Sequence, residues 1–327
     1  MGPSAGYSLR EVRRTRGIGG YVVALAASLL LAVPAAAGAA LPVVYSGAAA
    51  DVYATAHLNG SPPGANDWSC HPSAAHPYPV VLVHGTLENM AYNWYTLSPL
   101  LRNEGYCVFA LNYGQEPGRV VGLPGALPPG GTGDIPTAAR ELASFVAEVR
   151  SATGSAKVDV VGHSQGGMMP RYYMRFLGGA EDVHALVALS PSNHGTTVDG
   201  FLNLLGLVGA EDVAGVALGV ACGVSCDQQL AGSPFIQELN AGGDTLPGVS
   251  YTVIETRYDE VVTPYTSAFL SGSQVTNIEL QRQCVLDASE HLATPFDHIA
   301  LRDVLNALDP AHAQAPICGI VLPVVGG

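Results

Sequence analysis

From residue 79 onward the chain alternates between short continuous apolar runs and amphipathic stretches. Continuous apolar runs of this length are typical of strands buried on both faces of a sheet. The chain has six of them: PVVLVHG, YCVFALNY, KVDVVGHS, HALVALS, VSYTVIETRYD and VTNIELQ. Strands that alternate with helices predict an α/β fold with a mostly parallel central sheet and helices on both faces.

Two amphipathic stretches are expected to form helices that pack on this sheet. Residues 135–150 follow Asp134, a suitable N-cap, and residues 297–308 show the same periodicity near the end of the chain. Residues 114–133 are rich in proline and glycine and predict a surface loop. Residues 41–78 are rich in proline, alanine and glycine, and we expect them to wrap the domain without regular structure. The apolar face of the first helix comprises Ile135, Ala138, Ala139, Leu142, Phe145, Val146 and Val149.

The first 39 residues have the pattern of a secretory signal peptide. Four arginines between residues 10 and 16 precede the apolar segment YVVALAASLLLAV, and small residues suited to cleavage follow it. That segment is too short for a membrane-spanning helix. We expect cleavage within residues 37–40 and a secreted protein with one catalytic domain, residues 40–327. Arg13 and Arg14 could instead belong to a twin-arginine signal, so the export route stays open.

Charge and cysteine content narrow the function of the exported chain. The leader holds four of the 14 basic and one of the 27 acidic side chains, which leaves residues 40–327 with a net charge of −16. Such an acidic surface argues against nucleic-acid binding. The six cysteines suggest disulfides, for which sequence alone allows 15 pairings. Sequential pairing closes short loops, namely Cys70 with Cys107, Cys222 with Cys226 and Cys284 with Cys318. A zinc site is the competing interpretation, but no pair has CxxC spacing.

Ser164 lies in the pattern that a nucleophilic serine requires. A predicted strand leads into GHSQG, residues 162–166, and a helical run follows. This is the nucleophile-elbow context, in which a tight turn presents the hydroxyl and glycines admit the crowded backbone. The alternative is an ordinary hydroxyl in a strand-to-helix turn.

A nucleophilic serine also needs an oxyanion site, and a loop near the start of the domain supplies candidates. VVLVHGT ends a predicted strand at His84, Gly85 and Thr86, where backbone N–H groups can point at the site. We expect the amides of Thr86 and Gln165 to be the two donors. His84 is expected to be a buried structural residue that takes no part in proton transfer.

The acid and the base should follow the serine in that order along the chain. SYTVIETRYDEVV offers Glu255, Asp259 and Glu260, and Asp259 is favoured because it comes just past the strand. His291 lies in a loop before the last helix, whereas His298 lies in the first turn of that helix. His291 is therefore the preferred base, with His298 as its rival.

Five motifs together carry a resemblance to a known family. They are VLVHGT, VVGHSQGGMMPRYYMRFLGG, LSPSNHGTT, YTVIETRYDEVVTPYTSAFL and SEHLATPFDHIALRDVLNALDP. With them the chain resembles the secreted actinobacterial lipases of the α/β-hydrolase superfamily, the lipase class 2 family. The resemblance implies the α/β-hydrolase fold, hydrolysis of acylglycerols or other carboxylic esters, and no cofactor or metal. It assigns the nucleophile to Ser164, the acid to Asp259 and the base to His291; the family commonly lacks a histidine at the position of His298.

A nearly uncharged run, residues 198–222, bears on the substrate. Within a cap region of about residues 198–240 it predicts either a mobile lid or acyl-pocket wall, or a buried helical pair. A triacylglycerol lipase acting at a lipid–water interface is the favoured function, with no stable protein partner. A short-chain carboxylesterase, a polyester hydrolase and an acyltransferase use the same triad and remain alternatives. A non-catalytic binder of apolar ligands is the alternative outside catalysis.

Overall fold

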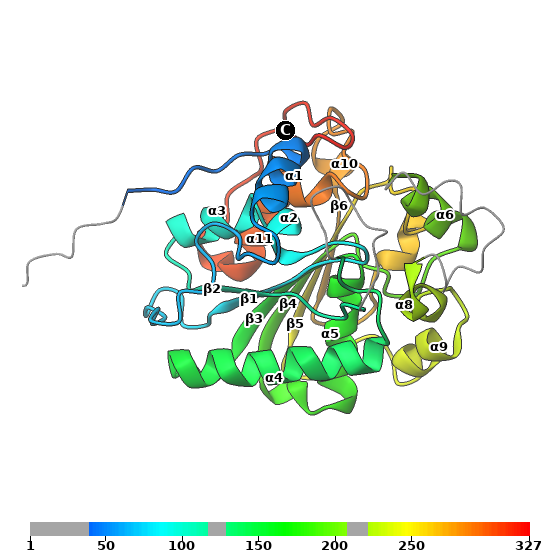
Figure 1. The fold of residues 1–327 in the computed structure, drawn as a ribbon, viewed down its shortest axis with the longest axis horizontal. Helices are drawn as coiled ribbons and strands as arrows, with labels where there is room; N and C mark the ends of the chain where they lie inside the picture. Colours follow the sequence, from blue (N-terminus) through cyan, green and yellow to red (C-terminus); the bar gives the residue numbers. More distant parts are fainter. Residues whose placement is uncertain (1–38, 117–128, 208–221) are drawn as a thin grey trace, which may run out of the picture. The chain divides into compact units, whose positions relative to one another are not determined.

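Six parallel strands form one sheet at the centre of the molecule, in the order β2-β1-β3-β4-β5-β6 (Figure 1). All six predicted strands are present, which confirms the predicted parallel sheet. Their continuous apolar character follows from burial on both faces, as in β1, where every residue is buried. The strands are β1 (Val80–Val83), β2 (Val108–Leu111), β3 (Val158–His163), β4 (Val183–Leu189), β5 (Ser250–Glu255) and β6 (Val275–Glu279).

The computed structural model describes residues 39–116, 129–207 and 222–327. The predicted signal peptide, the middle of the 114–133 loop and part of the 198–222 run lie outside the described residues. Residues 40–327 form one compact unit.

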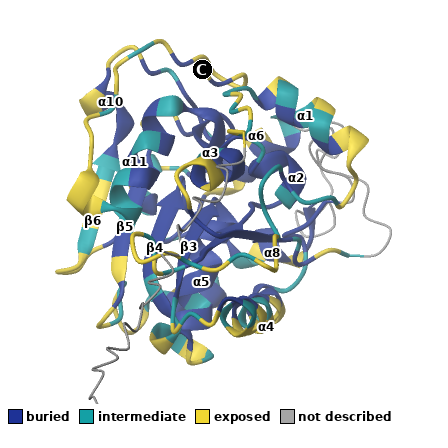
Figure 2. Ribbon diagram, turned by 90° about the vertical axis from the view of Figure 1, so that its left-hand side faces the viewer, coloured by how far each residue is buried: buried dark blue, intermediate teal, exposed yellow. Residues whose placement is uncertain are grey.

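Two helical layers cover the sheet. Helices α3 (Leu97–Asn103) and α11 (His298–Leu308) lie on one face, and α4 (Ile135–Thr153) and α5 (Gln165–Phe176) on the other (Figure 1). Alternate strand residues separate into two buried clusters, so that the side chains of one strand serve both faces. The burial map shows this sandwiched sheet as the most buried part of the fold (Figure 2).

Both predicted helices are confirmed, with small differences at their ends. Helix α4 begins at Ile135 and runs to Thr153, and the carboxylate of Asp134 accepts a hydrogen bond from the Thr137 amide at 3.0 Å, as expected of an N-cap. The shorter helices are α2 (Met90–Asn93), α6 (Val198–Leu207), α8 (Val224–Gln228), α9 (Pro234–Asn240) and α10 (Leu280–Gln283), with 3₁₀ turns at Gly179–Glu181, Tyr265–Ala268, Thr294–Phe296 and Pro310–His312.

The expectation that residues 41–78 lack regular structure is wrong for one helix, α1 (Gly47–Ala56). Its sequence, GAAADVYATA, has no clear apolar stripe and therefore gives no periodic signal. The helix forms because Ser46 caps it, accepting from the Ala49 amide at 3.3 Å, and because alanine has the highest helix propensity.

The three disulfides have the predicted sequential pairing. Cys70 binds Cys107, Cys222 binds Cys226 and Cys284 binds Cys318. The first ties the segment before β1 to the start of β2, and the last fastens the C-terminal segment to α10.

The strand order positions a ligand crevice at one place on the sheet. The chain leaves β1 toward α2 and α3 on one face, whereas it leaves β3 toward α5 on the other face. Where neighbouring parallel strands send their connections to opposite faces, a crevice opens at their carboxyl ends. Thr86 follows β1 and Ser164 follows β3, so both flank this switch point.

Candidate active site

Ser164 occupies a strained turn between β3 and α5. Its backbone has φ 54° and ψ −123°, a conformation that L-residues seldom adopt outside functional sites. The turn needs glycine on both sides. A Cβ on Gly162 would lie 1.9 Å from the Gly166 carbonyl oxygen, and one on Gly166 would lie 2.1 Å from the Val83 carbonyl oxygen.

The Ser164 hydroxyl is not used to cap the helix that it precedes. Serine at an N-cap usually accepts from an amide of the first turn, but the Ser164 side chain makes no such bond. The residue is 6% exposed. A strained backbone together with an uncapped helix is what a nucleophile elbow requires, and it weighs against an ordinary turn hydroxyl.

Asp259 and His291 form a buried hydrogen-bonded pair. The Nδ1 of His291 lies 2.7 Å from Oδ2 of Asp259, and the other carboxylate oxygen accepts from the amides of Val261 and Val262 at 2.8 and 2.6 Å. Both side chains are almost fully buried. With Nδ1–H donated to Asp259, Nε2 is the nitrogen left to exchange a proton.

The surroundings of His291 favour its charged form. Burial alone lowers the pKa of this imidazole, but the Asp259 carboxylate and its hydrogen bond outweigh burial, with help from Glu260 and Glu88. The pKa of His291 is thereby raised to about 9. Stabilising an imidazolium in this position is the task of the acid in a serine hydrolase triad.

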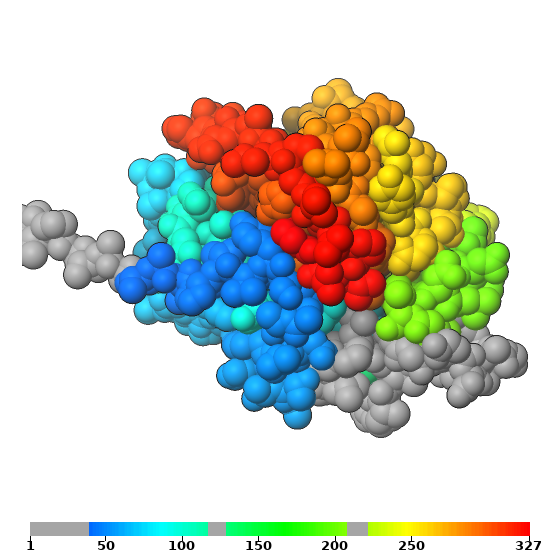
Figure 3. Space-filling model, turned by 90° about the horizontal axis from the view of Figure 1, so that it is seen from above, coloured from blue at the N-terminus to red at the C-terminus, as the bar shows by residue number. Residues whose placement is uncertain are grey.

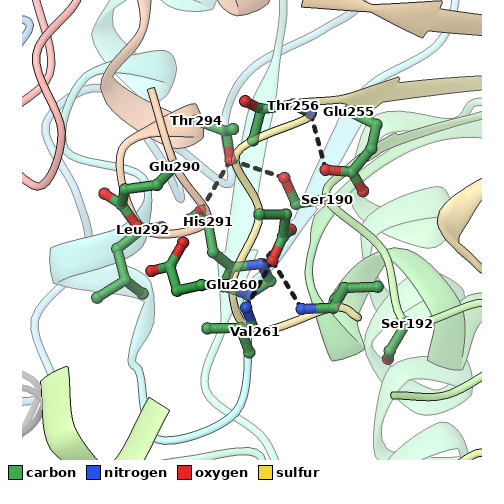
Figure 4. Close-up of polar contacts among 12 residues, drawn as sticks. Ser190, Ser192, Glu255, Thr256, Glu260, Val261, Glu290, His291, Leu292 and Thr294 are labelled. Atoms are coloured by element: carbon green, nitrogen blue, oxygen red, sulfur yellow. Dashed lines mark hydrogen bonds and ion pairs between the residues drawn. The ribbon is translucent and has the colours of Figure 1, made fainter. Parts of the chain in front are cut away.

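Glu255 and Glu260, the other two acids of this segment, lie near His291 (Figure 4). Both have raised pKa values. Burial, and then the negative charge of Asp259, raise the pKa of Glu255 well above its ordinary value, and Glu255 accepts from the Thr256 amide at 2.7 Å. Burial and the Glu290 charge raise the pKa of Glu260 to about 7. Of the three candidates, only Asp259 binds His291.

His298, the rival base, lies away from this cluster. It is the first residue of α11, and its Nδ1 and Nε2 face the carbonyl oxygens of Gly327 and Ile317 at 2.6 and 3.0 Å. His298 therefore fastens the C-terminal segment.

The predicted oxyanion residues lie side by side. Nε2 of Gln165 donates to the Thr86 hydroxyl at 3.0 Å, and the same hydroxyl accepts from Nε2 of Gln229 at 3.0 Å. The amide of Gln165 is the first of α5, and a helix leaves its first N–H groups without intrahelical partners. Gln229 was missed by sequence reasoning, because 143 residues separate it from Thr86.

His84 is confirmed as a structural residue. It is fully buried, and its Nδ1 donates to the Gly85 carbonyl oxygen at 2.8 Å. The carbonyl oxygen of His84 accepts from the Tyr113 hydroxyl at 2.7 Å. Burial lowers the pKa of His84 to about 4, so the ring stays neutral.

A second buried histidine beside the site gave no signal in the sequence. His163 directly precedes Ser164, and its ring centre lies 4.9 Å from that of His291. Its Nδ1 lies 3.1 Å from Oε2 of Glu88, a residue of the loop after β1. His163 lies in the GHSQG pattern, but nothing in the sequence pairs it with Glu88.

An apolar cluster borders the site. The loops that carry the predicted oxyanion donor, acid and base each contribute one buried residue to it: Leu87, Val261 and Leu292. Phe201, Leu204 and Leu205 of α6 complete the side toward the cap.

A pocket of about 190 Å³ opens beside Leu292. It lies between α1, the end of α6 and the C-terminal segment, and its lining is mostly apolar. The C-terminal residues lie against the N-terminal helix, and the Gly47 amide donates to the Val325 carbonyl oxygen at 3.1 Å (Figure 3). Across residues 39–116, 129–207 and 222–327, no group of three histidine, cysteine or acidic side chains is arranged to hold a metal ion.

Comparison with known proteins connects this geometry to a family. The family model described as Lipase (class 2) matches residues 77–300. A triacylglycerol lipase of Pseudarthrobacter phenanthrenivorans is 35% identical over 104 residues, covering 30% of this chain and 28% of that protein. One from Burkholderia plantarii is 35% identical over 104 residues, covering 30% and 25%. The matched region thus spans about a quarter of the length of these relatives.

A solved structure is similar over most of the chain. The crystal structure of Aspergillus fumigatus lipase B aligns with a TM-score of 0.55 at 21% identity, covering 84% of this chain and 65% of that one. This likeness and the strand order confirm the predicted α/β-hydrolase fold.

Proposed function

This chain belongs to the lipase class 2 family, and from that premise we propose that it is a triacylglycerol lipase that cleaves carboxylic esters through an acyl-enzyme on Ser164. The observation that carries the proposal is the buried Asp259–His291 pair at 2.7 Å, in loops at the same edge of the sheet as the strained Ser164 turn. Chain order supports it, because nucleophile, acid and base follow one another as they do in α/β hydrolases.

In this mechanism the neutral His291 takes the Ser164 proton on Nε2 while the serine oxygen attacks the ester carbonyl carbon. Asp259 holds the resulting imidazolium, and the amides of Thr86 and Gln165 bind the oxyanion. The imidazolium returns its proton to the leaving alcohol, and a water molecule, activated by His291 in turn, hydrolyses the acyl-enzyme. One oxyanion donor contributes roughly 10²- to 10³-fold to the rate.

The apolar cluster and pocket beside Leu292 support an ester with a hydrophobic chain. Helix α6 supports a substrate met at a lipid surface, since it buries Phe201 and Leu204 yet exposes Val198 and Leu202. A helix that is apolar on both sides suits a cap which contacts lipid when open and the pocket when closed. We propose that the lid lies within residues 198–240.

Export is part of the same proposal. The pattern of residues 1–39 and the three disulfides suit an extracellular enzyme, because disulfides persist in oxidising compartments. None of the helices described in residues 39–116, 129–207 and 222–327 has the length and apolarity needed to span a bilayer.

The test is hydrolysis of a p-nitrophenyl ester chain-length series and of emulsified triolein by residues 40–327. We expect activity on long esters and triolein that falls by about 10⁴-fold or more in Ser164→Ala. Ser190→Ala is the matched control, because Ser190 also follows a central strand with positive φ, yet its hydroxyl donates to Thr294. We expect it to lose less than about 10-fold. Activity that survives in Ser164→Ala would refute the proposal.

The alternatives on the same triad give different outcomes. Hydrolysis of short soluble esters alone indicates a carboxylesterase, release of monomers from polyester film indicates a polyester hydrolase, and transfer to added alcohols faster than to water indicates an acyltransferase. Failure of an organophosphonate to label Ser164 in folded protein would indicate a non-catalytic binder.

A further inference from the structure

His163 is bonded to the backbone of the proposed base. It is fully buried, and its Nε2 lies 3.0 Å from the carbonyl oxygen of His291. A carbonyl oxygen only accepts, so Nε2 carries the hydrogen. The residue next to the nucleophile thus holds the loop of His291 in place.

The other nitrogen of His163 faces a carboxylate. Nδ1 lies 3.1 Å from Oε2 of Glu88, and the same oxygen accepts from the Gly85 amide at 2.8 Å. One of these two atoms carries the hydrogen that joins the imidazole to the carboxyl group. Burial by itself raises the pKa of Glu88, but the interaction with His163 and the hydrogen bonds from His163 and Gly85 outweigh burial and lower it. Glu88 and His163 thus form a buried hydrogen-bonded pair.

Asn93 adds a third polar side chain to this pair. Its Nδ2 lies 3.1 Å from Nδ1 of His163, so that Nδ1 faces both the Asn93 amide and the Glu88 carboxyl group. All three side chains are buried, and both ring nitrogens of His163 have partners.

We propose that the hydrogen-bonded Glu88–His163 pair is a positioning device that sets the spacing of the oxyanion loop, the nucleophile turn and the base loop. Glu88 holds the oxyanion loop through Gly85, His163 fixes the turn by its place in the chain, and its Nε2 holds His291. The inference rests on the proposed function, since it assigns a role in the same reaction. Misplacement of reacting groups by about 1 Å costs on the order of 10²-fold in rate, so such a device affects kcat.

The competing explanation is a pair that only stabilises the core. A buried hydrogen bond between polar side chains contributes only modestly to net stability, because desolvation offsets much of its attraction. A purely structural pair would lower the folded fraction when broken and leave the rate per folded molecule unchanged. A positioning pair would lower that rate and leave substrate binding largely unchanged.

The chain offers a matched control at the opposite end of β3. Nδ1 of His184 lies 2.7 Å from Oδ1 of Asp159, so this pair also joins an imidazole to a carboxylate. Asp159 is buried near the start of β3, and His184 lies near the start of β4, away from the carboxyl ends that carry the site.

The experiment compares Glu88→Gln, His163→Gln, His163→Leu and Asp159→Asn with the wild type, using p-nitrophenyl butyrate. Phosphonate titration counts the active sites, and thermal unfolding reports stability. We expect Glu88→Gln and His163→Leu to lower kcat per titrated site by about 10- to 100-fold with KM within about 3-fold. His163→Gln keeps a donor for the His291 carbonyl and should retain more activity than His163→Leu. Asp159→Asn should leave kcat per site unchanged.

The pH profile adds a readout that a structural role would not move. The negative charge of Glu88 favours the protonated form of His291, so Glu88→Gln should shift the acid limb of kcat/KM to lower pH. Unchanged kcat per titrated site in both Glu88→Gln and His163→Leu would overturn the inference. The proposed function fails separately, if Ser164→Ala remains active or the wild type cannot be titrated.

Discussion

Two buried histidine–carboxylate pairs lie next to each other in this protein, with ring centres 4.9 Å apart, and only one is suited to chemistry. In both pairs Nδ1 faces a carboxylate that also accepts a backbone N–H, from Val261 for Asp259 and from Gly85 for Glu88. The second nitrogen distinguishes them. Nε2 of His163 donates to a carbonyl oxygen, whereas Nε2 of His291 has no partner among the described residues.

The difference teaches that pairing an imidazole with a carboxylate does not by itself make a base. The pair must also leave one nitrogen available to a reacting group, as His291 does. His163 uses both nitrogens for structure. In our proposals the contribution of His163 to the reaction is therefore geometric, while that of His291 is chemical.

The prediction with the largest expected effect replaces each of the two candidate bases, His291 and His298, with alanine. His291→Ala should lower kcat/KM on a soluble ester by roughly 10⁴- to 10⁶-fold, because the serine then has no group to take its proton. His298→Ala should stay within about 3-fold, since His298 only contacts carbonyl oxygens of the C-terminal segment. Equal losses in the two variants would contradict the assignment of the base.

The pH dependence of the reaction sharpens the contrast further. His291 must be neutral to accept a proton, and its pKa is raised to about 9, so kcat/KM should rise with pH between about 6.5 and 9 and level off above. Glu260 contributes to that shift. Glu260→Gln should therefore move the acid limb of the profile to lower pH by about half a unit or more.

Glu255→Gln is the control for charge in this experiment. Burial and the charge of Asp259 favour the protonated form of Glu255, and Glu255 is not among the groups that raise the pKa of His291. We expect its acid limb to coincide with that of the wild type. A shift in Glu255→Gln as large as that in Glu260→Gln would show that local packing, and not charge, sets the profile.

Local sequence patterns predicted most of the fold and the proposed triad. The six strands, the Ser164 turn and the order of Asp259 and His291 could be predicted because each depends on a few neighbouring residues or on chain order. Glu88 and His163 could not be paired in this way, since 75 residues separate them and only the adjacency of β1 and β3 brings their loops together. Helix α1 escaped prediction for the opposite reason, because it depends on alanine propensity and the Ser46 cap without an apolar stripe.

A buried carboxylate at the end of the loop that carries His291 belongs to a third pair, and this pair contains no histidine. Asp297 faces Asp287, and the Ser289 hydroxyl donates to Asp287 at 2.6 Å and lies 3.2 Å from Oδ2 of Asp297. Burial, followed by the charge of Asp287, raises the pKa of Asp297 to about 8. In this pair a second carboxyl group, and not an imidazole, faces the carboxylate.

The last prediction concerns the pH dependence of stability. Between about pH 4 and pH 8 Asp297 is ionised in the unfolded chain but protonated in the folded one, so the free energy of unfolding should fall as pH rises, by up to about 1.4 kcal/mol per pH unit. Asp297→Asn keeps the cap on Ile299, which Asn also provides, and removes the titration, so denaturation at pH 5, 6, 7 and 8 should give a flatter slope. Asp309→Asn, at the exposed end of the same helix, should keep the wild-type slope in this range. Equal slopes for the wild type and Asp297→Asn would mean that the Asp287–Asp297 pair shares no proton. The lack of a histidine would then not explain how this pair differs from the other two.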